Sequence, residues 1–318
     1  MIKILVLGAG AVGLGLSSFL LQSGCSVTIV GKKEVVDLLR GKGLSRIGIF
    51  GELYYSPGTF CAISNLNDIS PEEYDFILVC VKSFDSEALS RQLEKLVKFD
   101  SPNIVLCQNG WGNAEKFLKY FSKMNVFNAR VITGFIRPEP NIVEVTVHAQ
   151  PVHLGSLFIS DLKRLSLLSE AISGGGLPCE VTQEIAKDLW AKMLYNCPLN
   201  ALGAILEVPY GSLGEEKSSR IIMDGIIEEV FIVMEAMGYQ THWQNTQEYL
   251  EEFYGKLLPS TYEHESSMLQ DMRNGKKTEI ESINGIIIEE GIKRNIEVPF
   301  NHLICNLIHF LQEKQNPP

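Results

Sequence analysis

Apolar runs alternate with helical patterns along residues 2–181 of the chain. Runs rich in β-branched and aliphatic residues, with few polar positions inside them, are typical of strands buried on both faces of a parallel sheet. Such runs lie at residues 2–7, 25–30, 74–81, 103–107 and 126–135. Helical patterns lie between or after them, at residues 14–22, 34–40, 86–97, 113–121 and 160–172. This alternation predicts a doubly wound α/β fold.

Shorter strand patterns lie between these elements. Residues 47–50 and 59–62 indicate strands or a hairpin, and residues 142–147 and 152–154 indicate antiparallel additions. A last short strand is expected at residues 179–181, and nearly everything after it has helical period. We therefore predict two domains, an α/β domain at residues 1–181 and an all-α domain at residues 182–318.

A glycine pattern follows the first predicted strand at once. Six residues join that strand to the first helix: Gly8, Ala9, Gly10, Ala11, Val12 and Gly13. In such a turn the first glycine allows the tight bend, the second lets the backbone approach a pyrophosphate, and the third lets the helix pack on the strand. The N–H groups at the helix start then face the phosphates. In this context the pattern predicts a Rossmann-type dinucleotide-binding domain rather than a glycine-rich turn without a ligand.

The end of the second predicted strand indicates which dinucleotide binds. An NAD enzyme usually has Asp or Glu there, and its carboxylate binds the ribose 2′-hydroxyl. Here the strand is followed by Gly31, Lys32 and Lys33. We therefore predict NADPH (NADP) as the cofactor, with Lys32 as the contact to the 2′-phosphate. Two alternatives stay open: Glu34 could be the ribose carboxylate of an NAD enzyme, and the lysines could belong to a solvated loop.

Lys82 and Asn109 follow two further predicted strands. In open α/β sheets, ligands bind beyond the carboxyl ends of the strands, near the point where the strand order reverses. Lys82 could therefore meet the cofactor phosphates or the substrate, and Asn109 could position the substrate or the nicotinamide. The alternatives are a surface lysine and a turn asparagine before Gly110, and for either residue alone they are the better interpretation.

A polar stripe runs along the first helix of the second part, at residues 182–207. Lys192, Asn196 and Asn200 recur at a spacing of four and therefore share one side of the helix. Most other positions are apolar, so we expect the helix to be buried and its stripe to face an internal polar space. The alternative is a solvated stripe with an ordinary pair between Asp188 and Lys192, but asparagine is a poor helix former and has no reason to recur there.

Lys192 has the chemistry that a ketone reductase needs. Hydride delivered to a carbonyl carbon leaves an oxygen that must receive a proton, and a lysine near the nicotinamide can polarise the carbonyl and donate that proton. We expect desolvation or nearby positive charge to lower the pKa of this lysine. Pro198, further along the same helix, should kink it. The six histidines form no catalytic pattern and no metal-ligand spacing, so we expect no metal.

The last part of the chain carries helix-capping signals. Residues 264–275 form a helical pattern with serines at its start and Asn274-Gly275 at its end. Thr278 to Glu281 matches a capping box that opens a helix at residues 279–294. From the residues alone, these serines and glutamates are caps.

Composition and charge narrow the class of protein. With 318 residues, 45% of them hydrophobic and 21% charged, the chain fits two globular domains. The net charge of −10 argues against a nucleic-acid partner. No apolar run approaches the ~20 residues that span a bilayer, and the chain begins with a strand rather than a signal peptide, so we expect no membrane partner. Seven cysteines without a CxxC, mostly in apolar runs, indicate buried thiols in a cytoplasmic protein.

Taken together, the motifs resemble the ketopantoate reductase (2-dehydropantoate 2-reductase) family over essentially the whole chain. The matching segments are Gly8–Gly13, Val81-Lys82, Gln108-Asn109-Gly110, Trp190-Ala191-Lys192 with Asn196 and Asn200, and Ser266–Asp271 with Thr278-Glu279-Ile280 and Ile283-Asn284-Gly285. The resemblance implies NADPH-dependent reduction of the small-molecule 2-keto acid 2-dehydropantoate to pantoate, on the pathway to pantothenate and coenzyme A.

The resemblance also implies roles for single residues. Lys192 is the general acid, and Glu279 lies near it and near the cofactor ribose. The substrate carboxylate and hydroxyl are held by Asn196, Asn200 and Ser267. The junction of cofactor and substrate is lined by Lys82 and Asn109, and Lys32 stands where the family often has a basic residue for the 2′-phosphate.

Two departures from the family put the 2-keto acid in question. Tyr210 stands before Gly211, where many members have Asn, so it replaces or removes a substrate contact. The aromatic stretch at residues 241–265 is longer than usual and could reshape the mouth of the cleft. The alternatives are therefore a reductase of another branched 2-keto acid and a non-catalytic NADPH-binding sensor, which would not need the second part. That helical part could also supply a homodimer surface.

Overall fold

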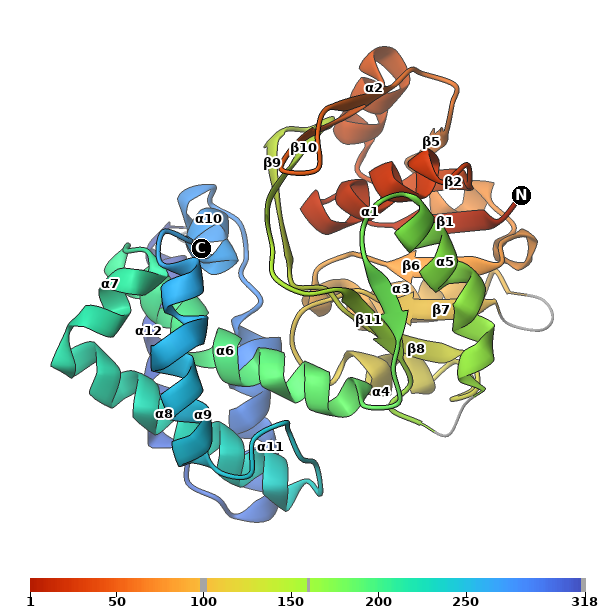
Figure 1. Cartoon of the computed structure of the whole chain (residues 1–318). Coiled ribbons are helices and arrows are strands. Elements are labelled where there is room, and N and C mark those ends of the chain that lie inside the picture. The colour runs from red at the N-terminus through yellow and green to blue at the C-terminus, as the bar shows by residue number, and fades with distance from the viewer. Residues whose placement is uncertain (98–101, 159–160, 316–318) are drawn as a thin grey trace. The chain divides into compact units, whose positions relative to one another are not determined.

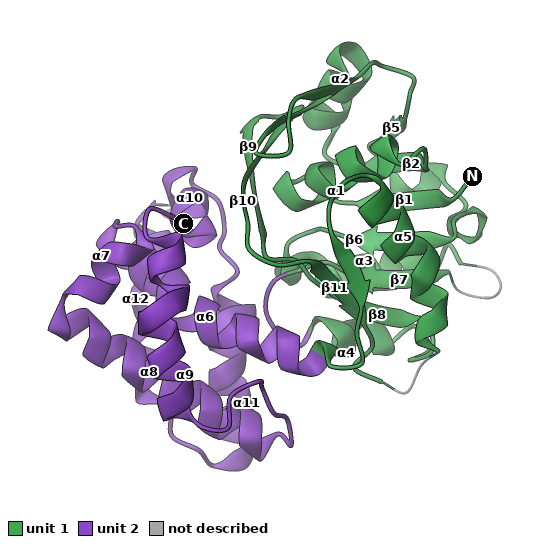
Figure 2. Cartoon of the chain, viewed as in Figure 1, with its two compact units in different colours: residues 1–108, 113–185 green, residues 109–112, 186–318 purple. Residues whose placement is uncertain are grey.

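The computed structural model describes residues 1–97, 102–158 and 161–315, and the chain divides into two compact units (Figure 2). Unit 1 comprises Met1–Gln108 and Asn113–Ile185, and unit 2 comprises Asn109–Gly112 and Ala186–Pro318. The predicted division into a dinucleotide-binding part, residues 1–181, and a substrate-binding part, residues 182–318, concerns function and stays a prediction. The end of that second part, residues 316–318, and the predicted helix start at Ser160 lie outside the described residues.

A sheet of eight strands forms the centre of unit 1 over the described ranges. Its spatial order is β12 (Cys179–Val181), β11 (Val152–Gly155), β8 (Val126–Arg130), β7 (Asn103–Leu106), β6 (Phe76–Val79), β1 (Lys3–Leu7), β2 (Ser26–Val30) and β5 (Cys61–Ile63). The strands from β8 to β5 are parallel, whereas β11 is antiparallel to β8. The strand order reverses at β1, as in a doubly wound sheet. The predicted α/β fold is confirmed.

Helices cover both faces of this sheet (Figure 1). They are α1 (Ala11–Gln22), α2 (Lys33–Lys42), α3 (Ser86–Glu94), α4 (Asn113–Leu118) and α5 (Ser166–Gly174), with short 3₁₀ turns η1 (Leu66–Asp68), η2 (Pro71–Glu73), η3 (Ser83–Asp85) and η4 (Leu162–Leu165). Successive side chains of a strand point to opposite faces. Accordingly Ile4 and Val6 of β1 pack in the cluster that contains α1 and α5, whereas Leu5 and Leu7 pack with α3 and α4.

A second, four-stranded sheet lies on α1, within the residues described. Its order is β4 (Leu53–Tyr55), β3 (Leu44–Gly48), β10 (Ile142–His148) and β9 (Thr133–Glu139). The ring of Phe135 on β9 occupies the space beside Gly15, where a Cβ would come within 2.5 Å of it. The glycine thus lets this sheet approach the helix.

Three strand predictions change in detail. The single strand expected at residues 126–135 is wrong, because β8 and β9 belong to different sheets. Of the two alternatives for residues 47–50 and 59–62, a mutual hairpin is wrong: β3 pairs with β4, and β5 joins β2. The antiparallel additions are confirmed, since β10 pairs with β9 and β11 pairs with β8.

Every regular element in the described part of unit 2 is a helix or a helical turn. It contains α6 (Ile185–Leu206, whose first residue belongs to unit 1), α7 (Tyr210–Glu215), α8 (Lys217–Ala236), α9 (Thr246–Glu252), α10 (Ser267–Arg273), α11 (Ile286–Arg294) and α12 (Pro299–Gln315), the π-helical turns η5 (Phe253–Leu257) and η7 (Glu281–Gly285), and the 3₁₀ turn η6 (Pro259–Thr261). The predicted all-α second part is confirmed. None of the described helices has the length and apolar character needed to span a membrane.

The capping predictions near the end of the chain are met in part. Ser266 caps α10, since its hydroxyl accepts a hydrogen bond from Leu269 N at 2.9 Å. The capping box at Thr278 does not close, because Thr278 Oγ1 accepts from Ile280 N, while the Glu281 carboxylate contacts Nε2 of His309 at 2.6 Å. The expected helix at residues 279–294 therefore begins with the π-helical turn η7.

Buried polar contacts hold the helices of unit 2 together. The Glu229 carboxylate on α8 accepts hydrogen bonds from the main-chain N–H groups of Phe300 and Asn301, at 2.7 and 2.9 Å. These are orphan donors in the first turn of α12, so the carboxylate caps that helix. Asn301 then accepts from Asn284 Nδ2, which also donates to the carbonyl of Cys197 on α6. The chain of contacts thus links α8, α12 and η7 to α6.

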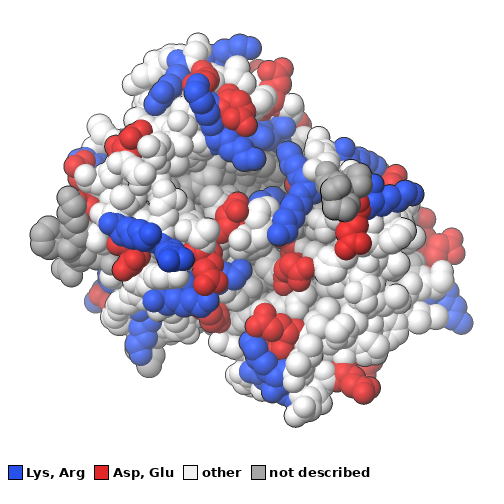
Figure 3. Space-filling view, turned by 180° about the vertical axis from the view of Figure 1, so that it is seen from behind, with Lys and Arg blue, Asp and Glu red and all other residues white. Residues whose placement is uncertain are grey.

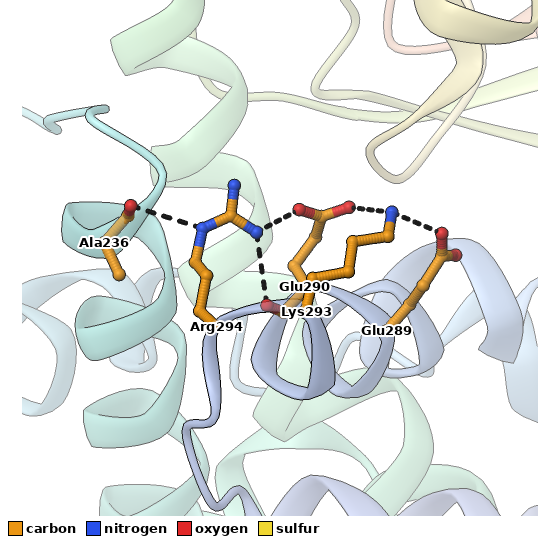
Figure 4. A network of polar contacts seen from close by, with 5 residues as sticks. All are labelled: Ala236, Glu289, Glu290, Lys293 and Arg294. Carbon is orange, nitrogen blue, oxygen red and sulfur yellow. Dashed lines mark hydrogen bonds and ion pairs between the residues drawn. The ribbon is translucent and has the colours of Figure 1, made fainter.

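Charged contacts close the end of α11 (Figure 4). Arg294 donates to the carbonyl of Ala236 at the end of α8 and to Glu290, while Lys293 contacts Glu289 and Glu290. Burial acts to raise the pKa of Glu290, but the hydrogen bonds from Lys293 and Arg294 outweigh it and lower the pKa below its usual value. Glu290 therefore stays ionised at neutral pH.

The cysteines and the charged side chains of the described residues indicate neither a metal site nor one continuous acidic surface on the face shown in Figure 3. All seven cysteines are free thiols, mostly buried, although Cys61 is exposed. Over the residues that can be described, no group of three or more His, Cys, Asp or Glu is placed to hold a metal ion. On the face in Figure 3, Lys and Arg side chains lie among Asp and Glu side chains, so the acidic excess does not form one continuous surface there.

Candidate active site

The glycine turn of unit 1 has little room on one side and open space on the other. Gly8 has φ of 118°, and a Cβ there would lie 2.7 Å from the main chain of Cys80. A Cβ on Gly13 would lie 1.9 Å from the carbonyl oxygen of Gly8, so α1 packs directly on the turn. By contrast, a Cβ on Gly10 would meet nothing within 4 Å. The turn is therefore closed toward the sheet and open at the start of α1, where unbonded N–H groups suit a phosphate.

Lys82 lies beside this turn through the end of β6. The main chain of Cys80 and Val81 touches Gly8, and half-buried Lys82 follows at the start of η3. Gln108, after β7, donates from Nε2 to the carbonyl of Val81 at 2.9 Å and so fixes the two strand ends to each other. Lys82 thus lies at the carboxyl edge of the sheet next to the switch point, where ligands of such sheets bind.

The end of β2 also touches the glycine turn. A Cβ on Gly31 would lie 2.6 Å from Cβ of Ala9, so no side chain fits at this position, and a carboxylate there is excluded sterically. Lys32 is exposed and stands at the N-cap of α2. Lys33 instead contacts Asp37 at 2.7 Å. Glu34, the alternative ribose ligand, is exposed in the first turn of α2.

Arg137 reaches the same turn from β9, and sequence reasoning missed it. Its Nη1 donates to the carbonyl oxygen of Ala9 at 2.8 Å, although the two residues lie 128 positions apart. No motif in the sequence marks this arginine. It becomes visible only once β9 is seen to lie over α1.

In unit 2, Lys192 and Asn109 are brought together. Lys192 Nζ donates to Oδ1 of Asn109 at 2.6 Å. The segment that carries Asn109 is fixed against the π-helical turn η7, because Trp111 N donates to the carbonyl of Ser282 at 2.9 Å. The Trp111 ring also packs on that of Trp190, with the centroids 4.6 Å apart. The predicted strand-end asparagine is therefore a neighbour of the predicted catalytic lysine.

The polar stripe of α6 lies in the buried part of unit 2. Asn196 is 8% exposed and Asn200 is 3% exposed. Tyr210 on α7 donates its hydroxyl to Oδ1 of Asn200 at 2.7 Å. Burial raises the pKa of the Tyr210 phenol well above its usual value, so the hydroxyl stays protonated and acts as the donor. This contact holds Oδ1 of Asn200 against Tyr210 and so fixes the orientation of the amide.

Ser267, the serine that the family resemblance implies for substrate binding, lies next to Ser266, which has a clear structural role. Ser267 is exposed at the start of α10. Ser266, which is fully buried, donates to the main-chain carbonyl of Asn200 at 3.0 Å and so joins the start of α10 to the polar stripe. Glu279 is 6% exposed, just before η7, the turn that also holds the Asn109 segment.

Two aromatic residues of the stretch at 241–265, Tyr249 and Phe253, belong to the interior of unit 2. Tyr249 and Phe253 are fully buried and stack with their centroids 5.6 Å apart, and Trp243 packs edge-on against Tyr249 at 4.7 Å. Their role is therefore to fill the core of the unit, and the expected effect on a cleft mouth does not apply to Tyr249 and Phe253.

The predicted site residues thus fall into two groups. Unit 1 carries the glycine turn, Lys32 and Lys82, and unit 2 carries Asn109, Lys192, Asn196, Asn200, Ser267 and Glu279. The first group can bind the phosphates of a dinucleotide through main-chain N–H groups and ammonium groups. The second group offers one cationic proton donor and several amide donors, which suits a small acid with a carbonyl group. Pro198 lies inside α6, which continues through it to Leu206.

Comparison with known proteins gives matches over nearly the whole chain. The family model of ketopantoate reductase PanE/ApbA matches residues 4–157, and the model of its C-terminal part matches residues 184–312. The chain is 34% identical over 310 residues to the 2-dehydropantoate 2-reductase of Aquifex aeolicus, covering 96% of each chain. It is 28% identical over 314 residues to the enzyme of the same name from Pyrococcus horikoshii, again covering 96% of each.

Solved structures match as well. A PanE/ApbA family ketopantoate reductase from Ralstonia eutropha superposes with a TM-score of 0.86 at 25% identity, covering 99% of each chain. A ternary structure of D-mandelate dehydrogenase with NADH and anilino(oxo)acetate gives a TM-score of 0.88 at 23% identity, covering 99% of each, and shows the same fold.

Proposed function

The chain belongs to the ketopantoate reductase PanE/ApbA family and is an oxidoreductase, and from this premise we propose that it reduces 2-dehydropantoate to pantoate with NADPH. Relatives that align over 96% of the chain carry the name of this reaction. The residues of both units agree with the chemistry that the reaction requires.

The glycine turn of unit 1 fits a dinucleotide. The open space at Gly10 leaves the start of α1 accessible to a pyrophosphate, while Gly8 and Gly13 close the turn against the sheet. When bound, the cofactor supplies the hydride that reduces the keto carbon. Lys82 adds positive charge beside the turn, and Lys32 is our candidate for the 2′-phosphate. The steric exclusion of a carboxylate at Gly31 favours NADPH over NADH.

The polar groups of unit 2 fit the keto acid. Lys192 donates a proton from Nζ to the carbonyl oxygen, which becomes the new hydroxyl of pantoate, and the lysine is left neutral until it regains a proton from water. Asn109 orients Nζ by accepting one of its N–H bonds. The amide groups of Asn196 and Asn200 and the hydroxyl of Ser267 form hydrogen bonds with the carboxylate and the hydroxyl of the substrate. We assign Glu279 to the support of Lys192 and of the cofactor ribose.

One observation carries this proposal. Lys192 shares one side of α6 with two nearly buried asparagines, Asn196 and Asn200, and its ammonium group is held by Asn109 at 2.6 Å. Burying polar side chains is costly unless each finds a partner, so three of them on one side of a helix favour a functional role over a purely structural one.

The test is product formation. The protein is incubated with NADPH and 2-dehydropantoate, and pantoate is followed by NMR while NADPH is followed by absorbance. We expect one pantoate for each NADPH consumed, and no consumption without the keto acid. NADPH consumption without pantoate, or binding of NADPH without turnover, would exclude this function.

A second candidate is reduction of another branched 2-keto acid. The observation that favours it is Tyr210, which occupies Oδ1 of Asn200 where many members of the family have an asparagine. An aromatic ring at this place changes the shape offered to the substrate while Lys192 and Asn109 keep their roles. The ratio of kcat/KM values for 2-dehydropantoate and 2-ketoisovalerate distinguishes the two candidates.

A further inference from the structure

Arg137 is a half-buried cation that has no carboxylate beside it among the residues described. Its one hydrogen bond there goes to the main-chain carbonyl of Ala9. Burial alone lowers the pKa of this guanidinium, and no acidic group acts on it. Two other arginines have a carboxylate partner, since Arg273 pairs with Glu265 and Arg294 pairs with Glu290. The buried Arg46 is held instead by Gln22 and the main-chain carbonyl of Phe50. A desolvated cation without an anion is costly, so the place of Arg137 suits a ligand that brings negative charge.

The local backbone aims Arg137 at the glycine turn. In the β9–β10 pairing, Ile136 lies opposite Glu144 and Glu139 opposite Ile142. Two residues of β9, Arg137 and Pro138, therefore stand opposite one residue of β10, which is a β-bulge. A bulge redirects the side chain that it carries, and the proline after Arg137 holds that residue extended.

Arg137 meets the turn at the residue that touches the end of β2. Ala9 accepts the hydrogen bond from Arg137, and its Cβ fills the space beside Gly31. Lys32 follows Gly31 directly. The pyrophosphate is expected at the start of α1, two residues further along the chain from Ala9, whereas the end of β2 is where the adenosine ribose of a dinucleotide binds in this fold.

We propose that Arg137 binds the 2′-phosphate of NADPH together with Lys32, and that it determines the preference for NADPH over NADH. This inference rests on the proposed function, because it concerns the same cofactor. A guanidinium presents a planar fork of donors that matches two phosphate oxygens while one Nη stays on Ala9. The 2′-phosphate carries between one and two negative charges, so a second cation besides Lys32 adds to its neutralisation. NADH has a neutral hydroxyl there and gains nothing from Arg137.

The experiment measures cofactor binding without turnover. Dissociation constants for NADPH, NADH and adenosine 2′,5′-bisphosphate are determined by calorimetry for the wild type and for Arg137→Gln. We expect Arg137→Gln to weaken NADPH and the bisphosphate by about tenfold or more, equivalent to ~1.4 kcal/mol. Binding of NADH should not change. Arg137→Lys keeps the positive charge but loses the planar pair of donors, so its affinity for NADPH should lie between those of the wild type and of Arg137→Gln.

Arg164→Gln is the matched control. Arg164 is also half-buried in unit 1, and it donates to the main-chain carbonyl of Met124, which precedes β8 and so lies at the sheet edge opposite the glycine turn. We expect no change in the affinity for any of the three ligands. Equal weakening of NADPH and NADH by Arg137→Gln would indicate a pyrophosphate contact or a damaged turn, and no weakening of either would indicate a structural arginine. Either result would overturn the inference, while a wild type that prefers NADPH but forms no pantoate would overturn only the substrate assignment.

Discussion

Asn109 sets the direction of the Lys192 ammonium group. An ammonium group has three N–H donors, and the one held by Oδ1 of Asn109 at 2.6 Å orients the other two. We expect Lys192→Ala to lower kcat with 2-dehydropantoate by about 100-fold or more, the usual contribution of a general acid. Initial rates of NADPH oxidation measure this. The Kd of NADPH should stay unchanged, since our account assigns the cofactor phosphates to unit 1.

Lys187→Ala is the control for this prediction. Lys187 lies five residues earlier on α6 and therefore on another side of the helix. It should leave kcat near the wild-type value. A Lys192→Ala variant that retains most of the wild-type rate would show that another group supplies the proton.

The Tyr210 hydroxyl fixes the amide of Asn200. Tyr210→Phe removes the donor to Oδ1 of Asn200 and lets the amide rotate. We expect KM for 2-dehydropantoate to rise by about tenfold with a smaller change in kcat, and stability to fall by about 1–2 kcal/mol because a buried acceptor loses its partner. Tyr195→Phe is the control, because it removes a mostly buried hydroxyl that contacts Thr261 instead. Equal KM effects in both variants would contradict a specific role for Tyr210.

At the scale of the elements, the position of helix α6 depends on buried hydrogen bonds that connect it to α8 and α12. Glu229 caps α12, and Asn301 and Asn284 pass the contact on to the Cys197 carbonyl of α6. We expect Glu229→Ala to lower the free energy of unfolding of unit 2 by about 2–4 kcal/mol, because buried N–H groups and an amide lose a charged acceptor. Urea unfolding followed by tryptophan fluorescence measures this unit alone, since the chain's three tryptophans, at positions 111, 190 and 243, all belong to it.

Glu228→Ala is the matched control on the same helix. Glu228 is exposed and is the direct neighbour of Glu229, so its removal should change stability by less than about 0.5 kcal/mol. A similar small loss for Glu229→Ala would mean that solvent satisfies the start of α12 and that this contact does not position α6.

The elements show where prediction from the sequence succeeds and where it ends. The strands β1, β2, β6 and β7 and the helix α6 follow from apolar runs and helical period, because burial on both faces leaves a strong pattern. The break between β8 and β9 does not, because only the pairing of β9 with β10 takes the chain into the second sheet. The bulge that aims Arg137 arises from the same pairing and leaves no local signal.

At the scale of the whole molecule, the sequence indicates the single candidate residues of the site but not which of them come together in the fold. The glycine turn and the polar stripe are local patterns. That residues 109–112 belong to unit 2 is a tertiary fact, since it depends on Trp111 meeting Ser282 and Trp190 far along the chain. The partners of single side chains, such as Tyr210 with Asn200, likewise follow from packing rather than from spacing.

The most direct test of this account is a comparison of kcat/KM values for 2-dehydropantoate, 2-ketoisovalerate, pyruvate and oxaloacetate, each with NADPH and with NADH. Our account predicts that 2-dehydropantoate with NADPH has the highest value, because the Lys192 group suits a 2-keto acid with a hydroxyl and the turn beside Gly31 suits a 2′-phosphate. A higher value for another acid would contradict the substrate assignment. Equal values with NADH would contradict the roles of Lys32 and Arg137, and no turnover with any acid would contradict catalysis by Lys192.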